Sequence, residues 1–253
     1  PLFEYLKSLP KNRLILVRGN HEDLYEELLY KYFPQQHDVS NGTLRTFCTQ
    51  TKYPQEYMFR SFWKKQEKKD FGMETGAYEG KEYYYWQAIR NQVKESEITK
   101  FILDKERWLN YVEIGPYIIV HSRFPSVENW RNLDKNSSSW SSARWGSPID
   151  FYMWYFNRKH LSQDGRKGKV LVCAHWFAGD FFRKIDGIKK PGKKLNFYHT
   201  NNLVALDAGV DIKYLNKEKT SWELTHKQNV LIIDESFKAY DKNGNLIIDP
   251  IIR

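Results

Sequence analysis

Short runs of apolar residues recur along the chain, separated by polar and charged segments. An unbroken apolar run is typical of a strand buried on both faces, whereas apolar residues at helical spacing indicate an amphipathic helix. The apolar runs predict strands at 13–17, 117–120, 169–174, 202–207 and 229–234, and the helical spacing predicts helices at 2–9 and 24–33. Helix, strand, polar loop and helix in this order are typical of layered α/β enzymes.

The segments between these elements carry their own signals. The serine-rich stretch at 136–142 predicts a loop, and the Asn243-Gly244 pair predicts a hairpin turn before a strand at 246–248. The aromatic and charged segment 34–107 predicts a largely helical insertion. With a length of 253 residues, the chain is expected to form a single domain over 1–253 that contains this insertion.

Composition narrows the class of protein. Aromatic residues make up 16% of the chain, which argues against intrinsic disorder, and the net charge of +9 favours anionic partners such as phosphate esters or nucleic acid. No apolar stretch is long enough to predict a membrane span, and the two distant cysteines, Cys48 and Cys173, cannot build a disulfide framework. We therefore expect a cytoplasmic protein with no membrane partner, in which Cys173 is a core thiol.

Three of the predicted strands end in the same kind of residue. Asn20-His21, His121 and His175 each follow an apolar run. Imidazole nitrogens and amide oxygens are good ligands for manganese, iron or zinc. A single histidine in such a place is more often an ordinary surface residue, but the repetition predicts a metal centre at the strand ends.

These residues carry a resemblance to a known family. Segment 19–22 reads Gly-Asn-His-Glu and resembles the GNHE motif of the calcineurin-like metallophosphoesterases, in the serine/threonine protein phosphatase and dinucleoside tetraphosphatase branches. The positions of His121 and His175 are similar to later histidine motifs of that family. The resemblance implies an α/β (α+β) fold, a two-sheet β-sandwich flanked by helices. It also implies two divalent metal ions, expected to be Mn²⁺ with Fe or Zn as alternatives.

The resemblance also implies roles for individual residues. Asn20, His121 and His175 would bind one metal, and His21 would protonate the leaving oxygen. A hydroxide activated between the two metals would hydrolyse a phosphate ester of a phosphoprotein or a nucleotide. Arg144 is a candidate phosphate-binding residue, because a guanidinium forks onto phosphate oxygens, although the sequence favours an ordinary surface arginine there.

Two family motifs do not occur in this chain. Asp-x-His and Gly-Asp-x-x-Asp, which supply the first metal's ligands and the bridging aspartate, are missing before segment 19–22. We therefore expect the chain to be the C-terminal part of a longer protein. The alternative is a non-catalytic scaffold that binds nucleic acid or a protein partner through the lysines and aromatic residues of 57–86.

Overall fold

The computed structural model describes residues 2–30, 38, 42–51, 81–155, 168–189, 198–207, 212–214, 222–224 and 229–249. The chain divides into two compact units, which are described separately. The first comprises Pro1–Ile15 and Asn20–Trp108, and the second comprises Leu16–Gly19 and Leu109–Arg253. The boundary thus falls within the Gly-Asn-His-Glu segment, between Gly19 and Asn20. No helix formed by the described residues is long and apolar enough to cross a membrane.

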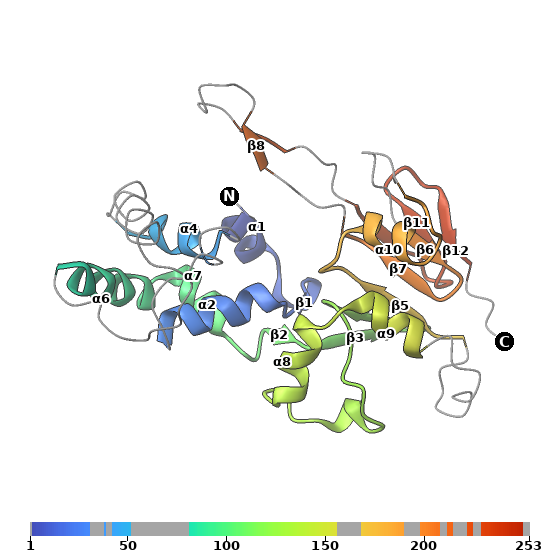
Figure 1. Ribbon diagram of the computed structural model, residues 1–253, viewed down its shortest axis with the longest axis horizontal. Coiled ribbons are helices and arrows are strands. Elements are labelled where there is room, and N and C mark those ends of the chain that lie inside the picture. Colours follow the sequence, from blue (N-terminus) through green and yellow to red (C-terminus); the bar gives the residue numbers. More distant parts are fainter. Residues whose placement is uncertain are drawn as a thin grey trace. The chain divides into compact units, whose positions relative to one another are not determined.

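Helices make up the described part of the first unit (Figure 1). They are α1 (Leu2–Ser8), the short 3₁₀ helix Lys11–Arg13, α2 (Asn20–Tyr30), α4 (Thr43–Cys48), α6 (Lys81–Lys94) and α7 (Glu97–Leu103). The structure confirms the helices predicted at the start of the chain, with α2 beginning four residues earlier than expected. Helices α4, α6 and α7 fall within 34–107. That this segment is an insertion stays a prediction.

An apolar core and a polar network join these helices. Leu28, Phe47 and Ile89 are fully buried, one from each of α2, α4 and α6. Beside them the Tyr25 hydroxyl lies 2.5 Å from the Thr99 hydroxyl and accepts a hydrogen bond from the Gln50 amide. The buried hydroxyls of Tyr25 and Thr99 therefore have hydrogen-bond partners, which removes the penalty for burying them.

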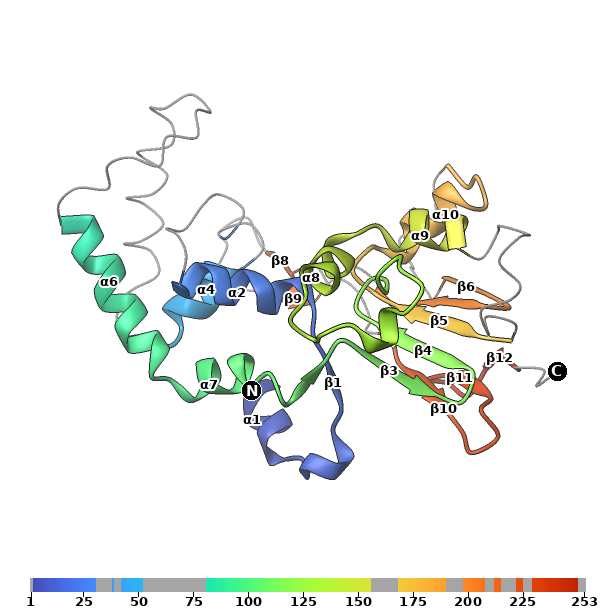
Figure 2. The same cartoon turned by 90° about the horizontal axis from the view of Figure 1, so that it is seen from below.

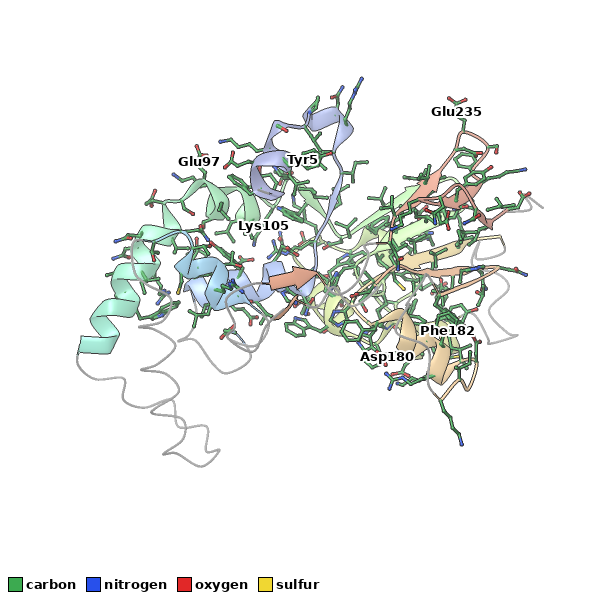
Figure 3. The ribbon with its side chains drawn as sticks, turned by 90° about the horizontal axis from the view of Figure 1, so that it is seen from above. Tyr5, Glu97, Lys105, Asp180, Phe182 and Glu235 are labelled. Carbon is green, nitrogen blue, oxygen red and sulfur yellow. The ribbon has the colours of Figure 1, made fainter. Side chains whose placement is uncertain are left out.

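Surface contacts add to the packing of the first unit. The Lys7 ammonium pairs with the Glu97 carboxylate at 2.6 Å and so links α1 to α7. Figure 3 shows Glu97 on α7 and Tyr5 on α1. Both partners of the ion pair are half or more exposed, so solvent screens the pair and we expect it to contribute little to stability.

The strand predicted at 13–17 is wrong in extent and burial. Arg13 ends a 3₁₀ helix, Ile15 is 59% exposed, and the paired strand β1 is limited to Leu16–Val17. Strand β1 pairs with β2 (Trp108–Leu109) in a two-stranded sheet, so it is not the central strand that an unbroken apolar run suggests.

A five-stranded sheet forms the centre of the second unit. Its strands are β3 (Tyr111–Ile114), β4 (Tyr117–Val120), β5 (Val170–Cys173), β6 (Tyr198–Thr200) and β7 (Leu203–Ala205), in the order β3-β4-β5-β7-β6. Strands β4, β5 and β7 are parallel, and the two edge strands are antiparallel to their neighbours. The strands predicted at 117–120, 169–174 and 202–207 are thereby confirmed as the buried parallel core.

The two faces of this sheet bury different partners. Alternate residues such as Ile118 and Leu171 pack under helices, whereas Tyr117, Val170 and Val204 pack against a second sheet. The helices are α8 (Ser138–Trp145), α9 (Pro148–Tyr155) and α10 (Ala178–Lys184), with a 3₁₀ turn at Trp130–Asn132. Figure 2 shows α8, α9 and α10 on one side of the sheet and β10, β11 and β12 on the other.

The second sheet is antiparallel and consists of β10 (Leu231–Ile233), β11 (Ala239–Asp241) and β12 (Leu246–Ile248). The predicted hairpin is confirmed, with Gly244 at φ 82° in the turn. Strand β10 is correctly placed, but Ile232 is 49% exposed, so only one face of this strand is buried. A further antiparallel pair consists of β8 (Ile212–Tyr214) and β9 (Trp222–Leu224).

The loop predicted at 136–142 is wrong, because α8 begins at Ser138. Trp140, Ala143 and Arg144 are buried at the i, i+3, i+4 spacing of one helical face. The Trp140 ring stacks on Tyr111 at a centroid distance of 5.5 Å. Burial of one helical face thus outweighs the low helix propensity of the serines.

Candidate functional site

Parallel pairing brings the carboxyl ends of three strands to one edge of the sheet. Ile119 of β4 is opposite Val172 of β5, and Cys173 of β5 is opposite Ala205 of β7. The residues that follow these strands therefore leave the sheet on the same side, which is where such folds place their binding sites. They include His121 after β4, His175 after β5 and Asp207 after β7.

The two predicted strand-end histidines lie in direct contact. The His121 Nε2 and His175 Nδ1 atoms are 3.1 Å apart, and the ring centroids are 4.9 Å apart at an interplanar angle of 56°. The Ala174 amide also donates to the His121 carbonyl at 2.9 Å, which extends the strand ladder to the site. Both rings are half-buried, so each combines a fixed position with access to solvent.

The backbone at His175 is in an unusual conformation. Its φ is 68°, in the left-handed region that residues other than glycine rarely adopt. The Trp176 amide donates to the Ala174 carbonyl at 2.8 Å, so His175 is the central residue of a tight three-residue turn. Such a conformation costs about 1–3 kcal/mol and occurs preferentially at functional sites.

Helix α10 follows this turn and is held to the next strand. The Ala178 amide donates to the Asp207 carbonyl at 2.7 Å, and the Phe182 ring packs edge-on against Tyr198 at 4.9 Å. Asp180, which pairs with Arg183, lies with Phe182 on α10 in Figure 3. These contacts fix the chain on the C-terminal side of His175.

The separation of the two ring nitrogens is that of a hydrogen bond between the imidazoles, and it is also compatible with two ligands on one metal ion. With metal–nitrogen bonds of about 2.1 Å, neighbouring ligand atoms lie about 3.0 Å apart in an octahedral site and about 3.4 Å apart in a tetrahedral one. The observed separation of 3.1 Å lies between these values. Within the described residues, no group of three or more histidine, cysteine, aspartate or glutamate side chains is arranged to hold a metal.

The other predicted site residues occupy a different part of the chain. Asn20 is buried and His21 is exposed, and both begin α2 in the first unit. Glu22 and Asp23 also lie in the first turn of that helix, where negative charge is favourable. The structure thus brings together His121 and His175, and the roles of Asn20 and His21 stay predictions.

Arg144 is not the surface residue that the sequence favours. Its side chain is only 7% exposed, and its Nη1 atom donates to Asn110 Oδ1 at 2.8 Å. The Asn110 amide in turn donates to the Lys135 carbonyl at 2.8 Å. Arg144 therefore anchors α8 to the start of the sheet, and its candidate role toward phosphate stays a prediction.

No protein family, curated protein or solved structure matches the chain. The geometry of the site and the motifs of the sequence therefore carry the functional argument.

The structure adds two residues that the motifs do not contain. Asp207 follows β7 at the same sheet edge as the histidines. Burial, and to a smaller extent the charge of Asp207, raises the pKa of the Cys173 thiol. Arg123 lies two residues after His121 and is half-buried. The position of Asp207 after an apolar run is a signal in the sequence, whereas nothing in the sequence marks Arg123.

Cys173 is confirmed as a core thiol.

The aromatic and lysine-rich segment of the alternative reading lies mostly outside the described residues. Only 81–86 of this segment is described, as part of α6. The Trp86 ring is 1% exposed and stacks on Phe47 in the core of the first unit. Trp86 is thus a core residue, so its predicted place in a base-stacking surface is wrong.

Proposed function

We propose that this protein is a metal-dependent phosphoesterase whose second unit binds a divalent metal ion through His121 and His175. The observation that carries the proposal is the 3.1 Å approach of two imidazole nitrogens at the carboxyl edge of parallel strands. The Gly-Asn-His-Glu motif and the two histidine motifs support the assignment to metallophosphoesterase chemistry. The helix, sheet and second-sheet layers of the second unit are compatible with the implied sandwich.

The side chains themselves perform two tasks in this proposal. His121 and His175 present unprotonated ring nitrogens to a divalent cation, for which we favour Mn²⁺. When bound, such an ion supplies Lewis-acid chemistry toward a phosphoryl oxygen. The turn at His175 orients its ring before any ligand arrives, because the Ala174 and Ala178 amides fix the backbone before and after it. The substrate class is a phosphate ester, carried by a protein or a nucleotide.

Metal content and turnover of matched histidine variants test the proposal. We expect His121→Ala and His175→Ala each to lower Mn²⁺ affinity by at least about tenfold and to abolish hydrolysis of p-nitrophenyl phosphate. His199→Ala is the control, because His199 is an exposed histidine of β6 in the same unit. Equal Mn²⁺ affinity in wild type, His121→Ala and His199→Ala would overturn the assignment.

A further inference from the structure

Phe177 is a large apolar side chain in an exposed position close to the histidine pair. It lies two residues after His175 and is 52% exposed. It also occupies the N-cap position of α10, where its side chain makes no hydrogen bond to the helix. Serine, threonine, asparagine and aspartate are preferred at that position, because their side chains accept a bond from an amide of the first turn. A residue that breaks a local rule in this way is expected mainly at functional sites.

The side chains of His175 and Phe177 both reach solvent, on either side of a side chain that turns inward. Trp176, between them, packs against the apolar core of the second unit, and Lys184 Nζ lies 4.8 Å from the centre of its ring. Phe177 has an extended backbone, with φ −61° and ψ 138°, and successive side chains of an extended chain point in opposite directions. Two residues of chain span at most about 7 Å, a separation that the sugar of a nucleotide can bridge.

Hydrogen bonds hold the backbone of Phe177 in place. The Asp180 amide donates to the Phe177 carbonyl at 2.8 Å, and the next amide along the chain, that of Ala178, donates to the Asp207 carbonyl at 2.7 Å. The ring is therefore presented from a fixed backbone, so little conformational entropy is lost when a ligand packs on it.

A second exposed ring lies on the segment beside His121. Ser122, directly after His121, is fully buried, and its hydroxyl donates to the Gly146 carbonyl at 2.5 Å. This bond brings the end of α8 to the end of β4, and Trp145, the last residue of α8, is 45% exposed. Sites for small molecules are lined mostly by apolar and aromatic side chains around a few polar groups. The histidine pair, with an exposed ring on the segment beside each histidine, has this composition.

We propose that Phe177 binds the base of a nucleoside phosphate whose phosphate group lies at the histidine pair. An aromatic ring stacks on any nucleobase, because every base has a flat π-face. Phosphoserine and phosphothreonine carry no flat group beside the phosphate and would gain little from an exposed phenylalanine. The inference rests on the proposed phosphoesterase function, and it selects the nucleotide from the two substrate classes given there.

Titration calorimetry in the presence of Mn²⁺ tests the role of the base. It compares adenosine monophosphate with ribose 5-phosphate, which has the same phosphate and sugar but no base. We expect wild type to bind the nucleotide about 5- to 100-fold more tightly, the range of base–aromatic stacking, and Phe177→Ser to lose this preference. Leu246→Ser is the control and should keep it, because Leu246 is also 52% exposed but lies on β12 of the second sheet.

Three results of this titration would overturn the proposal. The first is a wild type that does not prefer the nucleotide, and the second is a preference of the same size in wild type and Phe177→Ser. The third is tighter binding of a phosphoserine peptide than of adenosine monophosphate by wild type.

Two variants of Phe177 guard against a folding defect. Serine supplies the missing N-cap acceptor, so we expect Phe177→Ser to raise the midpoint of urea unfolding while it weakens nucleotide binding. Phe177→Tyr keeps the ring, and we expect it to retain the preference for adenosine monophosphate. An equal loss of this preference in Phe177→Tyr and Phe177→Ser would refute a stacking role.

Kinetics with Mn²⁺ separate this proposal from the function it rests on. We expect Phe177→Ser to lower the ratio of kcat/KM for adenosine monophosphate to kcat/KM for glycerol phosphate, which has no ring. Nucleotide binding that depends on Phe177, without hydrolysis by wild type, would refute the phosphoesterase function and leave the role of Phe177. Hydrolysis of both esters with a ratio that is independent of Phe177 would refute the role of Phe177 alone.

Discussion

The strained turn at His175 leads us to predict an unusual order of stability among variants of this residue. At an ordinary position, glycine is less stable than alanine by about 0.5–1 kcal/mol, because the unfolded chain is more flexible. At φ 68° a Cβ atom is itself unfavourable by roughly 1–2 kcal/mol, and glycine avoids this cost. His175→Gly and His175→Ala both lose the contact with His121, so that contribution cancels in the comparison.

At position 175 we therefore expect the glycine variant to be more stable than the alanine variant, the reverse of the ordinary order. Subtracting the entropy cost of glycine from the relief of strain leaves His175→Gly more stable than His175→Ala by about 0.5–1 kcal/mol. Urea unfolding of the metal-free protein, followed by circular dichroism, measures this difference. Both variants are also expected to lose Mn²⁺ affinity, so the difference in stability between them reports the backbone strain and not metal binding.

The neighbouring residue supplies the control. Ala174 has no positive φ, and we expect Ala174→Gly to lower the free energy of unfolding by the ordinary amount of about 0.5–1 kcal/mol. If His175→Ala is as stable as His175→Gly, or more stable, the backbone strain at His175 is refuted, and with it the argument that this turn is held for function.

Two further predictions concern packing and pH. Gly115→Ala places a Cβ atom 2.5 Å from the Phe237 ring at φ 54°, whereas Gly187→Ala has a similar φ of 70° and nothing within 4 Å. We expect urea unfolding to show Gly115→Ala to be less stable than Gly187→Ala by about 1–3 kcal/mol, and equal losses would refute the clash. Burial raises the pKa of the Cys48 thiol from its ordinary value of 9.0 to about 11. The folded state favours the protonated thiol, so this stabilisation is present below pH 9 and is lost between about pH 9 and 11. Cys48→Ala should flatten the fall of the free energy of unfolding over that range, and an unchanged slope would contradict the shift.

Local sequence determined the elements whose signals lie within a few residues. The apolar runs at 117–120, 169–174 and 202–207 became the parallel strands, because unbroken apolar runs are stable only when both faces are covered. The turn at Gly244 and the helices at 2–9 and 24–33 followed from short-range signals. Because His121 and His175 directly follow two of these apolar runs, their position at strand ends was also determined by the sequence. The mixed α/β class followed from the order of the elements.

Tertiary packing decided what local signals cannot encode. The serines of α8 became helical because Trp140 and Arg144 share one buried face, and the run at 13–17 stayed mostly irregular because only the short strand β2 pairs with it. The pairing order that places His121 against His175 involves contacts across 54 residues of chain.

Arg123 shows the same limit at the level of one side chain. Its sequence context is unremarkable, and its surroundings come from Ser126, Phe151 and Gly146, which different segments contribute. Burial and the choice of counter-charge are properties of the assembled fold, because they depend on which segments meet. The environment of this arginine was therefore decided by tertiary structure alone.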